Sequence, residues 1–205
     1  MDRIVIADDH PLFRAALATA LARAAPGAAI EETDSLAGAR AALAAGAVDL
    51  LLLDLKLSDS EGFAGLASIR ADFPTAPVAI VSASEDAGTI RRALAFGAAG
   101  FIPKSATLSA MVEALEAILA GDIWAPTVSG EAPAGSMEAR IANLTPSQLK
   151  ILIGLQQGRL NKQIAFDLGV TEATIKAHLT GVFRKLGVQN RTQAVIAAQA
   201  LTADL

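Results

Sequence analysis

The sequence predicts two folded units of different class: an α/β unit with an open, doubly wound parallel sheet, then a small all-α unit. Short apolar runs alternate with alanine-rich helical patterns over roughly the first 120 residues, as in βα units, whereas the last 60 or so contain only helical patterns. The charge changes at the same place. Residues 1–140 carry 10 Lys and Arg against 18 Asp and Glu (net −8), and residues 141–205 carry 7 against 3 (net +4).

Five apolar runs are the predicted strands of the first unit: Arg3–Ala7, Ala28–Thr33, Val48–Leu53, Val78–Val81 and Gly100–Ile102. The helical patterns between and after them are Phe13–Ala24, Leu36–Ala45, Phe63–Asp72, Ala87–Phe96 and Leu108–Ala120. The third run is apolar almost throughout, which is typical of a parallel strand covered on both faces. Five such units predict a flavodoxin-like, five-stranded parallel sheet with right-handed crossovers.

Four helices are predicted for the second unit: Pro146–Gln157, Asn161–Leu168, Glu172–Leu186 and Arg191–Leu201. Thr145 and Gln148 have the spacing of a capping box around a proline at the first helical position. Gly158, Gly169 and Gly187 each follow an apolar periodic run, where a left-handed helix end is favoured. The short turn between the second and third helices has helix-turn-helix spacing. We therefore expect domains at 1–121 and 144–205, joined by a linker at 122–143 that is rich in turn-forming residues.

The composition excludes several kinds of protein. Hydrophobic residues make up 53% of the chain and charged residues 19%, so a core can form and general disorder is not expected. The chain has no cysteine, which excludes disulfides and thiolate chemistry and fits the cytoplasm, the location we expect. Only two histidines are present, so a histidine-rich zinc site is not expected. No apolar run is long enough to span a membrane, and we expect no membrane partner.

Polar residues follow four of the predicted strands, at the edge where such sheets bind ligands. They are Asp8 and Asp9 after the first strand, Asp54 after the third, Ser82 after the fourth and Lys104 after the fifth. Clustered carboxylates with oxygen-only ligands favour Mg²⁺. We expect Asp9, Asp54 and the backbone carbonyl of Lys56 to bind it directly, and Asp8 to act through water. Asp54 is then the candidate nucleophile towards a phosphoryl group, with Lys104 and Ser82 binding its oxygens.

These residues resemble the receiver domains of two-component response regulators of the NarL/FixJ type. The resemblance rests on Ile6–Arg14, Leu53–Gly62, Val81–Ala83 and Gly100–Lys104, in the family's order and spacing. It implies that Asp54 accepts a phosphoryl group from a histidine kinase or a small acyl phosphate, and that Phe101 is a switching aromatic. A solvated acidic turn at Asp8 and Asp9, and a purely structural core role for Phe101, are the alternatives. Ser58 departs from the family's usual proline.

The helical unit resembles LuxR-type DNA-binding domains through Leu144–Pro146, Gly158–Ala165, Thr174–Leu179, Lys185–Val188 and Arg191. In a helix-turn-helix the second helix enters the major groove of double-stranded DNA. The candidate base contacts are Thr174, Lys176, Ala177 and Thr180. The candidate phosphate contacts are Lys162, Arg184, Lys185 and Arg191, with His178 either a phosphate contact or a packed residue. The alternative for the basic residues is a solvated helix face.

Together these features predict a transcriptional response regulator that forms a homodimer when active and catalyses only its own phosphorylation and dephosphorylation. The alternative is a phosphorylation-independent DNA-binding regulator that uses the receiver as a dimerisation module. A metal-dependent phosphoester hydrolase is a third hypothesis, but it gives no reason for the basic C-terminal unit. The sequence does not identify the kinase, the stimulus, the operator or the sign of regulation.

Overall fold

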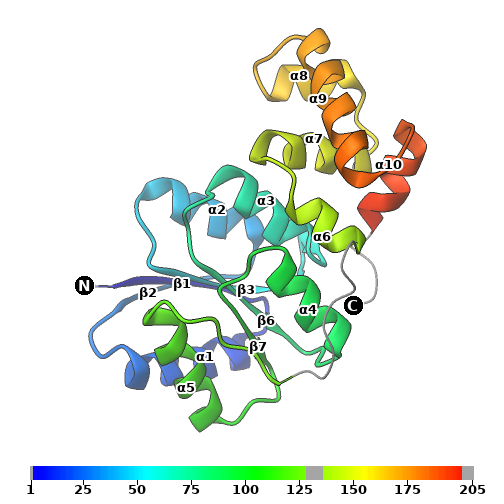
Figure 1. Cartoon of the computed structure of the whole chain (residues 1–205). Helices are drawn as coiled ribbons and strands as arrows, with labels where there is room; N and C mark the ends of the chain where they lie inside the picture. The colour runs from blue at the N-terminus through cyan, green and yellow to red at the C-terminus, as the bar shows by residue number, and fades with distance from the viewer. Residues whose placement is uncertain (1, 128–135, 200–205) are drawn as a thin grey trace.

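A parallel five-stranded sheet forms the centre of the N-terminal half in the computed structural model, which describes residues 2–127 and 136–199 (Figure 1). Its strands are β1 (Arg3–Ala7), β2 (Ala29–Thr33), β3 (Leu50–Asp54), β6 (Val78–Ser82) and β7 (Gly100–Pro103). Their order is β2-β1-β3-β6-β7, and every neighbouring pair is parallel. The predicted doubly wound, flavodoxin-like sheet is confirmed, and its order changes direction between β1 and β3.

Helices cover both faces of this sheet and bury two separate apolar clusters (Figure 1). One face carries α1 (Pro11–Ala24) and α5 (Leu108–Leu119), and the other carries α2 (Leu36–Ala45), α3 (Ala64–Asp72) and α4 (Ala87–Ala95). Successive strand residues alternate between the faces. Ile4 and Ile6 of β1 belong to the cluster under α1 and α5, whereas Val5 belongs to the cluster under the other three helices.

A short antiparallel hairpin that the sequence did not predict follows β3. It pairs β4 (Lys56–Leu57) with β5 (Ser60–Glu61). Asp59 at its turn accepts hydrogen bonds from the backbone N–H groups of Leu36 (2.8 Å) and Ala37 (2.9 Å), the first two residues of α2. The hairpin therefore provides a cap for a neighbouring helix, where a carboxylate is favoured.

The C-terminal half contains the four predicted helices, which are α7 (Pro146–Gln156), α8 (Asn161–Asp167), α9 (Glu172–Leu186) and α10 (Arg191–Ala198). The capping box at the start of α7 is present: Thr145 and Gln148 exchange hydrogen bonds between side chain and backbone. Gly187 ends α9 with φ = 72°, the left-handed conformation expected there. The end of the predicted last helix, residues 200–201, lies outside the described residues. Over the described ranges, no helix is both long and apolar enough to cross a membrane.

The segment predicted as a linker contains structure at both of its described ends. Trp124 forms a parallel bridge with Gly100, and its carbonyl accepts a hydrogen bond from Phe101 N at 2.8 Å. At the other end lies a helix that the sequence analysis did not expect, α6 (Met137–Ala142), whose first turn is capped by the side chain of Ser136. Residues 128–135, including Gly130, Pro133 and Gly135, lie outside the described residues. The helix was missed because it is short, and only one of its side chains, Ile141, is a large buried aliphatic.

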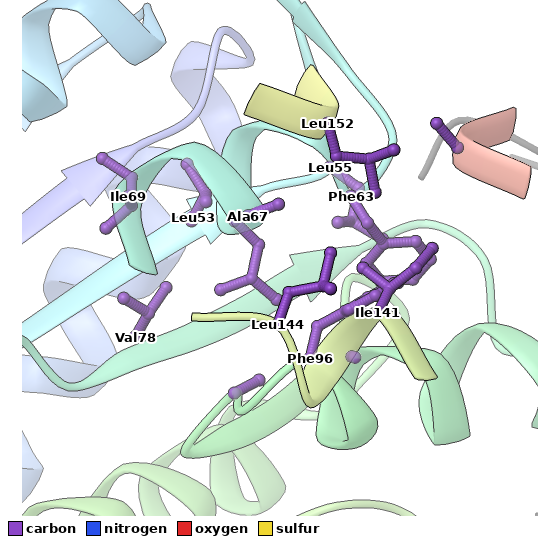
Figure 2. Close-up of a cluster of buried hydrophobic side chains, with 14 of the residues drawn as sticks. Leu53, Leu55, Phe63, Ala67, Ile69, Val78, Phe96, Ile141, Leu144 and Leu152 are labelled. Atoms are coloured by element: carbon purple, nitrogen blue, oxygen red, sulfur yellow. The ribbon is translucent and has the colours of Figure 1, made fainter. Parts of the chain in front are cut away.

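Helix α6 joins the two halves of the molecule. Ile141 is 1% exposed and belongs to the same buried cluster as Phe63 and Phe96 of the α/β domain (Figure 2). Its neighbour Arg140 donates a hydrogen bond from Nη1 to the carbonyl of Leu186 at 2.9 Å, at the last turn of α9. In α6, therefore, the apolar side chain of Ile141 packs on the α/β domain, and the polar side chain of Arg140 binds the helical domain.

A second contact between the domains packs α7 against α3. Asp72 at the end of α3 pairs both with Arg40 of α2 and with Lys150 of α7, so one carboxylate connects the domains. Partial burial raises the pKa of Asp72, but hydrogen bonds from Lys150 and Arg40 lower it more, and the net pKa lies below its usual value. The ionised form of Asp72 therefore stabilises the docked arrangement.

Candidate functional site

Polar side chains gather where four neighbouring strands of the sheet end. Asp8 and Asp9 directly follow β1, Asp54 is the last residue of β3, Ser82 is the last residue of β6, and Lys104 directly follows β7. Because these strands are parallel and adjacent, their carboxyl ends meet at one edge of the sheet. The structure brings the three aspartates and the lysine together there, as the sequence predicted from strand order.

Lys104 bridges two buried carboxylates. Its Nζ lies 2.7 Å from Asp54 Oδ2 and 2.8 Å from Asp8 Oδ2, and both carboxyl side chains are at most 3% exposed. The same ammonium lies 5.2 Å from the centre of the Phe13 ring, a cation–π contact that helps to hold it in place. A single positive charge thus stands between two negative ones, at the position where a phosphoryl group bound to Asp54 would need a counter-charge.

The Asp54 carboxylate is held in place by the backbone of Lys56 and by the side chain of Lys104. Its Oδ1 accepts a hydrogen bond from the backbone N–H of Lys56 at 3.0 Å. Burial raises the pKa of Asp54 and the nearby Asp8 charge raises it further; hydrogen bonding and attraction from Lys104 oppose this only in part, so the pKa stays above its usual value. The carboxylate is therefore poorly solvated, and it gains from any further cation that binds beside it.

The acidic residues fit a divalent cation. Ligand atoms of Asp8, Asp9, His10 and Asp54 lie within 4.8 Å of one another. The buried oxygens Asp8 Oδ2 and Asp9 Oδ1 lie 2.8 Å from Lys104 Nζ and 2.7 Å from His10 Nδ1, but accept no aligned hydrogen bond. They keep lone pairs available for a hard cation such as Mg²⁺. The sequence analysis did not assign a site role to His10. Its place three residues after the end of β1 was the available signal.

Ser82 lies at the same edge and is 4% exposed. Its Oγ accepts a hydrogen bond from Ser84 N at 3.1 Å, and its carbonyl accepts one from Lys104 N at 2.7 Å. The Ser84 hydroxyl in turn bonds to Asp86, the N-cap of α4. This chain of contacts links the candidate phosphate-binding hydroxyl to the start of α4 through three residues.

Phe101 is fully buried, with 0% exposure, and belongs to the cluster that includes Phe63, Phe96 and Ile141. The rings of Phe63 and Phe96 lie 5.4 Å apart. This placement connects the candidate switching aromatic to the joint at α6.

Helix α9 of the helix-turn-helix has one buried apolar face and one solvent-exposed face. Ile175, Leu179, Val182 and Leu186 of α9 are buried, and the opposite face carries the predicted base contacts. Of these, Lys176, Ala177 and Thr180 are exposed and Thr174 is half-buried. Lys176 pairs with Glu172 one turn earlier at 3.2 Å, a surface contact that DNA can displace at little cost.

The candidate phosphate contacts divide into two groups. Lys162 and Arg184 are exposed. Lys185 and Arg191 are half-buried and make contacts within the protein: Lys185 Nζ donates to the carbonyl of Asn143 at 2.9 Å, and Arg191 donates to Asn161 Oδ1 at 3.2 Å and to the carbonyl of Arg159. His178 is half-buried. The structure therefore favours Lys162 and Arg184 as the cations free to meet a phosphate.

Comparison with known families matches each half of the chain separately. Residues 4–116 match the response regulator receiver domain, and residues 142–198 match the bacterial regulatory proteins of the luxR family. The first match contains Asp8, Asp9, Asp54, Ser82 and Lys104, and the second contains the whole helix-turn-helix.

Alignments with two curated relatives cover nearly the whole of this chain. A glycerol metabolism activator of Pseudomonas putida is 39% identical over 97% of this chain and 95% of its own. A probable transcriptional regulatory protein NarL of Mycobacterium tuberculosis is 33% identical over 96% and 93%. A LuxR family DNA-binding response regulator from Silicibacter pomeroyi is 36% identical, with a TM-score of 0.54 over 62% of this chain and 98% of that one. RcsB in a DNA complex shares the fold at 20% identity, with a TM-score of 0.57 over 98% of this chain and 99% of that one.

Proposed function

Because the chain belongs to the response regulators that join a receiver domain to a LuxR-type DNA-binding domain, we propose that phosphorylation of Asp54 controls its regulation of transcription. The phosphoryl donor is a histidine kinase or a small acyl phosphate. The observation that carries the proposal is Lys104, whose Nζ lies within 2.8 Å of both Asp54 and Asp8 at the carboxyl edge of the sheet. This pairing holds a buried nucleophile beside a ready counter-charge.

The reaction is phosphoryl transfer to a carboxylate. An oxygen of Asp54 attacks the donor's phosphorus, the donor's P–N or P–O bond breaks, and its electron pair leaves with the donor. The ammonium of Lys104 and the hydroxyl of Ser82 then bind oxygens of the new phosphoryl group. In dephosphorylation, water attacks the same phosphorus, the P–O bond to Asp54 breaks with its electron pair on the carboxylate, and inorganic phosphate leaves. The protein is thus a switch that modifies its own side chain.

Mg²⁺ is the proposed cofactor. The carboxylates of Asp9 and Asp54 and the backbone carbonyl of Lys56 would hold it, and Asp8 would hold one of its waters. When bound, Mg²⁺ supplies the positive charge that offsets the phosphoryl oxygens and the clustered carboxylates. The raised pKa of Asp54 supports this assignment, since a nearby dication favours the ionised, nucleophilic form.

The proposed DNA contacts lie on the exposed face of α8 and α9. In this proposal Lys176 donates to a guanine edge, Ala177 touches a thymine methyl, and Thr180 bonds either kind of base. Lys162 and Arg184 fix the position on the phosphate backbone. The further candidates, with less exposure, are Thr174, His178, Lys185 and Arg191.

The signal has a continuous route from Asp54 to α9. A phosphoryl group that draws the Ser82 hydroxyl away from Ser84 N changes the loop before α4, whose N-cap bonds to the same Ser84. Helix α4 and the cluster containing Phe101 contact α6, which binds the end of α9 through Arg140. The output we propose is a homodimer that sets two helix-turn-helix units on a two-fold DNA site. Helix α10, where Ile196 is 58% exposed, is the candidate surface for pairing.

The proposal is tested by incubating the purified full-length protein with Mg²⁺ and acetyl phosphate and measuring its intact mass. We expect a phosphoryl adduct on the wild type, no adduct on Asp54→Asn, and a much smaller yield on Lys104→Ala. An adduct that persists in Asp54→Asn would refute the assignment of the acceptor. No adduct on a folded wild type would favour a phosphorylation-independent DNA-binding regulator whose receiver serves as a dimerisation module.

A further inference from the structure

A small cavity lies where the two domains meet, among α3, α4, α6 and α7 (Figure 1). Its volume is about 230 Å³. Sites for drug-sized ligands have volumes of roughly 300 to 1,000 Å³, so this cavity suits a smaller molecule. The α/β domain supplies the end of α3 and the turn after α4, and the other walls are α6 and the first turn of α7. The cavity is therefore complete only while the domains are docked.

Most of the lining of this cavity is apolar. Ala67, Phe96, Ile141 and Leu144 line it and belong to the buried cluster that spans both domains (Figure 2). Leu149 of α7 also lines the cavity and packs against the same cluster. Among the described residues that form the walls, none is acidic. Such a lining favours a ligand with an apolar body and disfavours a cation.

Arg70 of α3 supplies the positive charge of the lining. Its side chain is half-buried, and its Nη1 donates a hydrogen bond to the carbonyl of Pro74 at 2.9 Å. The guanidinium packs over Gly97, where a Cβ would lie 3.3 Å from Nε and 3.4 Å from Nη2. Within residues 2–127 and 136–199 no carboxylate pairs with Arg70, whereas Arg14 and Arg40 each have one.

A guanidinium with unused N–H donors beside an apolar wall is a suitable partner for a carboxylate, which it can bind through two parallel hydrogen bonds. We propose that the cavity binds a small monocarboxylate with a branched or aromatic apolar body, and that its carboxylate pairs with Arg70. The single positive charge of the lining matches a single negative charge on the ligand. This site is separate from Asp54, and ligand binding there does not depend on phosphorylation.

The ligand would couple to the arrangement of the domains. Because both domains form the walls, the ligand binds the docked state and stabilises it by mass action. By the same linkage, any event that undocks the helical domain lowers the affinity for the ligand. The regulator would then have a second chemical input, which opposes a movement of the helical domain away from the receiver.

Benzoate and isovalerate are suitable test ligands, and benzamide is the uncharged counterpart of benzoate. Each is titrated into the full-length protein and followed by NMR. We expect both carboxylates to bind saturably and benzamide to bind about tenfold more weakly or worse, because the hydrogen bonds to Arg70 are charge-assisted. Arg70→Gln should lose the preference for benzoate over benzamide. The matched control Arg23→Gln, at an exposed position in the last turn of α1, should keep it.

Two further variants test the place of the site and its link to docking. Ala95→Leu keeps Arg70 but adds a larger side chain to the cavity wall, so it should bind neither carboxylate while its melting curve shows an intact fold. Asp72→Asn removes the carboxylate that pairs with Lys150 across the domains. With a spin label on each domain, benzoate should raise the docked fraction of Asp72→Asn and leave that of the Asp72→Asn, Arg70→Gln double variant unchanged.

Three results would overturn the inference. The first is the absence of saturable binding of both carboxylates to the wild type. The second is a benzoate preference that survives in Arg70→Gln, or benzoate binding by a folded Ala95→Leu, since either would place the ligand elsewhere. The third is binding that leaves the docked fraction of Asp72→Asn unchanged, which contradicts a site formed by both domains.

Discussion

Replacing Ile141 by alanine should release the helical domain from the α/β domain. Ile141 is 1% exposed and lies in the cluster that spans both domains (Figure 2). Truncating a buried isoleucine to alanine costs about 2 to 5 kcal/mol. If half of the lower value falls on the contact between domains, about 1 kcal/mol, the ratio of docked to undocked molecules falls about fivefold. Arg140 keeps α6 on the helical domain, so the loss is felt where α6 meets the α/β domain.

The absence of native cysteine allows a direct distance measurement. Cysteines introduced at the exposed positions Glu113 and Thr192 carry spin labels, one on each domain. Pulsed electron resonance should show one narrow distance distribution in the parent protein and a second, broader population in Ile141→Ala. Ile118→Ala is the matched control, because Ile118 is 5% exposed and packs in the cluster on the opposite face of the sheet.

The outcome that would refute this reasoning is specific. If Ile141→Ala and Ile118→Ala lower the melting temperature alike and leave the same single distance distribution, α6 is only part of a core. The route from α4 to α9 would then lose its central element.

Three further predictions follow from individual side chains. Asp54→Asn should raise the melting temperature at neutral pH, because burial raises the pKa of Asp54 and the ionised carboxylate therefore destabilises the folded state. A lower melting temperature in the thermal scan would contradict this. The Asp72–Lys150 contact should stabilise docking at neutral pH and be lost as pH falls below about 4, since the pKa of Asp72 is lowered. The difference in docked fraction between wild type and Asp72→Asn should therefore shrink in acid. A difference that stays constant with pH would exclude a role for the ion pair in docking. Gly181→Ala should raise the free energy of unfolding by less than the usual value of about 1 kcal/mol, because a Cβ there would lie 2.8 Å from Nε2 of Gln148, a capping-box residue. The full increase should return in a Gln148→Ala background. Equal increases in both backgrounds, measured by urea unfolding, would contradict the steric clash.

The regular parts of this fold were predictable because local pattern and burial agree. The run ending at Asp54 is apolar on both faces and forms the central strand β3, whose five residues are all buried. The strand-end positions of Asp8, Asp54 and Lys104 then followed from the parallel sheet alone. The C-terminal helices have local start and stop signals in their capping residues. For this reason Gly187 and the Thr145 capping box lie where the sequence predicted them.

The features that the sequence did not reveal depend on contacts between distant residues. Helix α6 has only six residues, and Ile141 is recognised as a core residue only from its packing against the α/β domain. Lys185 and Arg191 are candidate phosphate contacts from the sequence, and in the structure they also bind the backbone carbonyls of Asn143 and Arg159. Sequence periodicity describes one element at a time, whereas these roles are set by pairs of elements.

Docking of the domains leaves the recognition face uncovered, and this limits how phosphorylation can act. Lys176, Ala177, Thr180 and Arg184 are all exposed while α6 and α7 are packed on the α/β domain. A single half-site therefore meets the same surface before and after phosphorylation, and its affinity should change little. Two adjacent half-sites differ, because binding both requires two helical domains at a fixed separation, which docking to the receiver constrains. Phosphorylation should accordingly raise affinity for paired half-sites far more than for one, as fluorescence anisotropy with single-site and double-site duplexes of a selected target would show. Equal gains on both duplexes would mean that the recognition helix itself is altered, and would move the switch from domain geometry to α9.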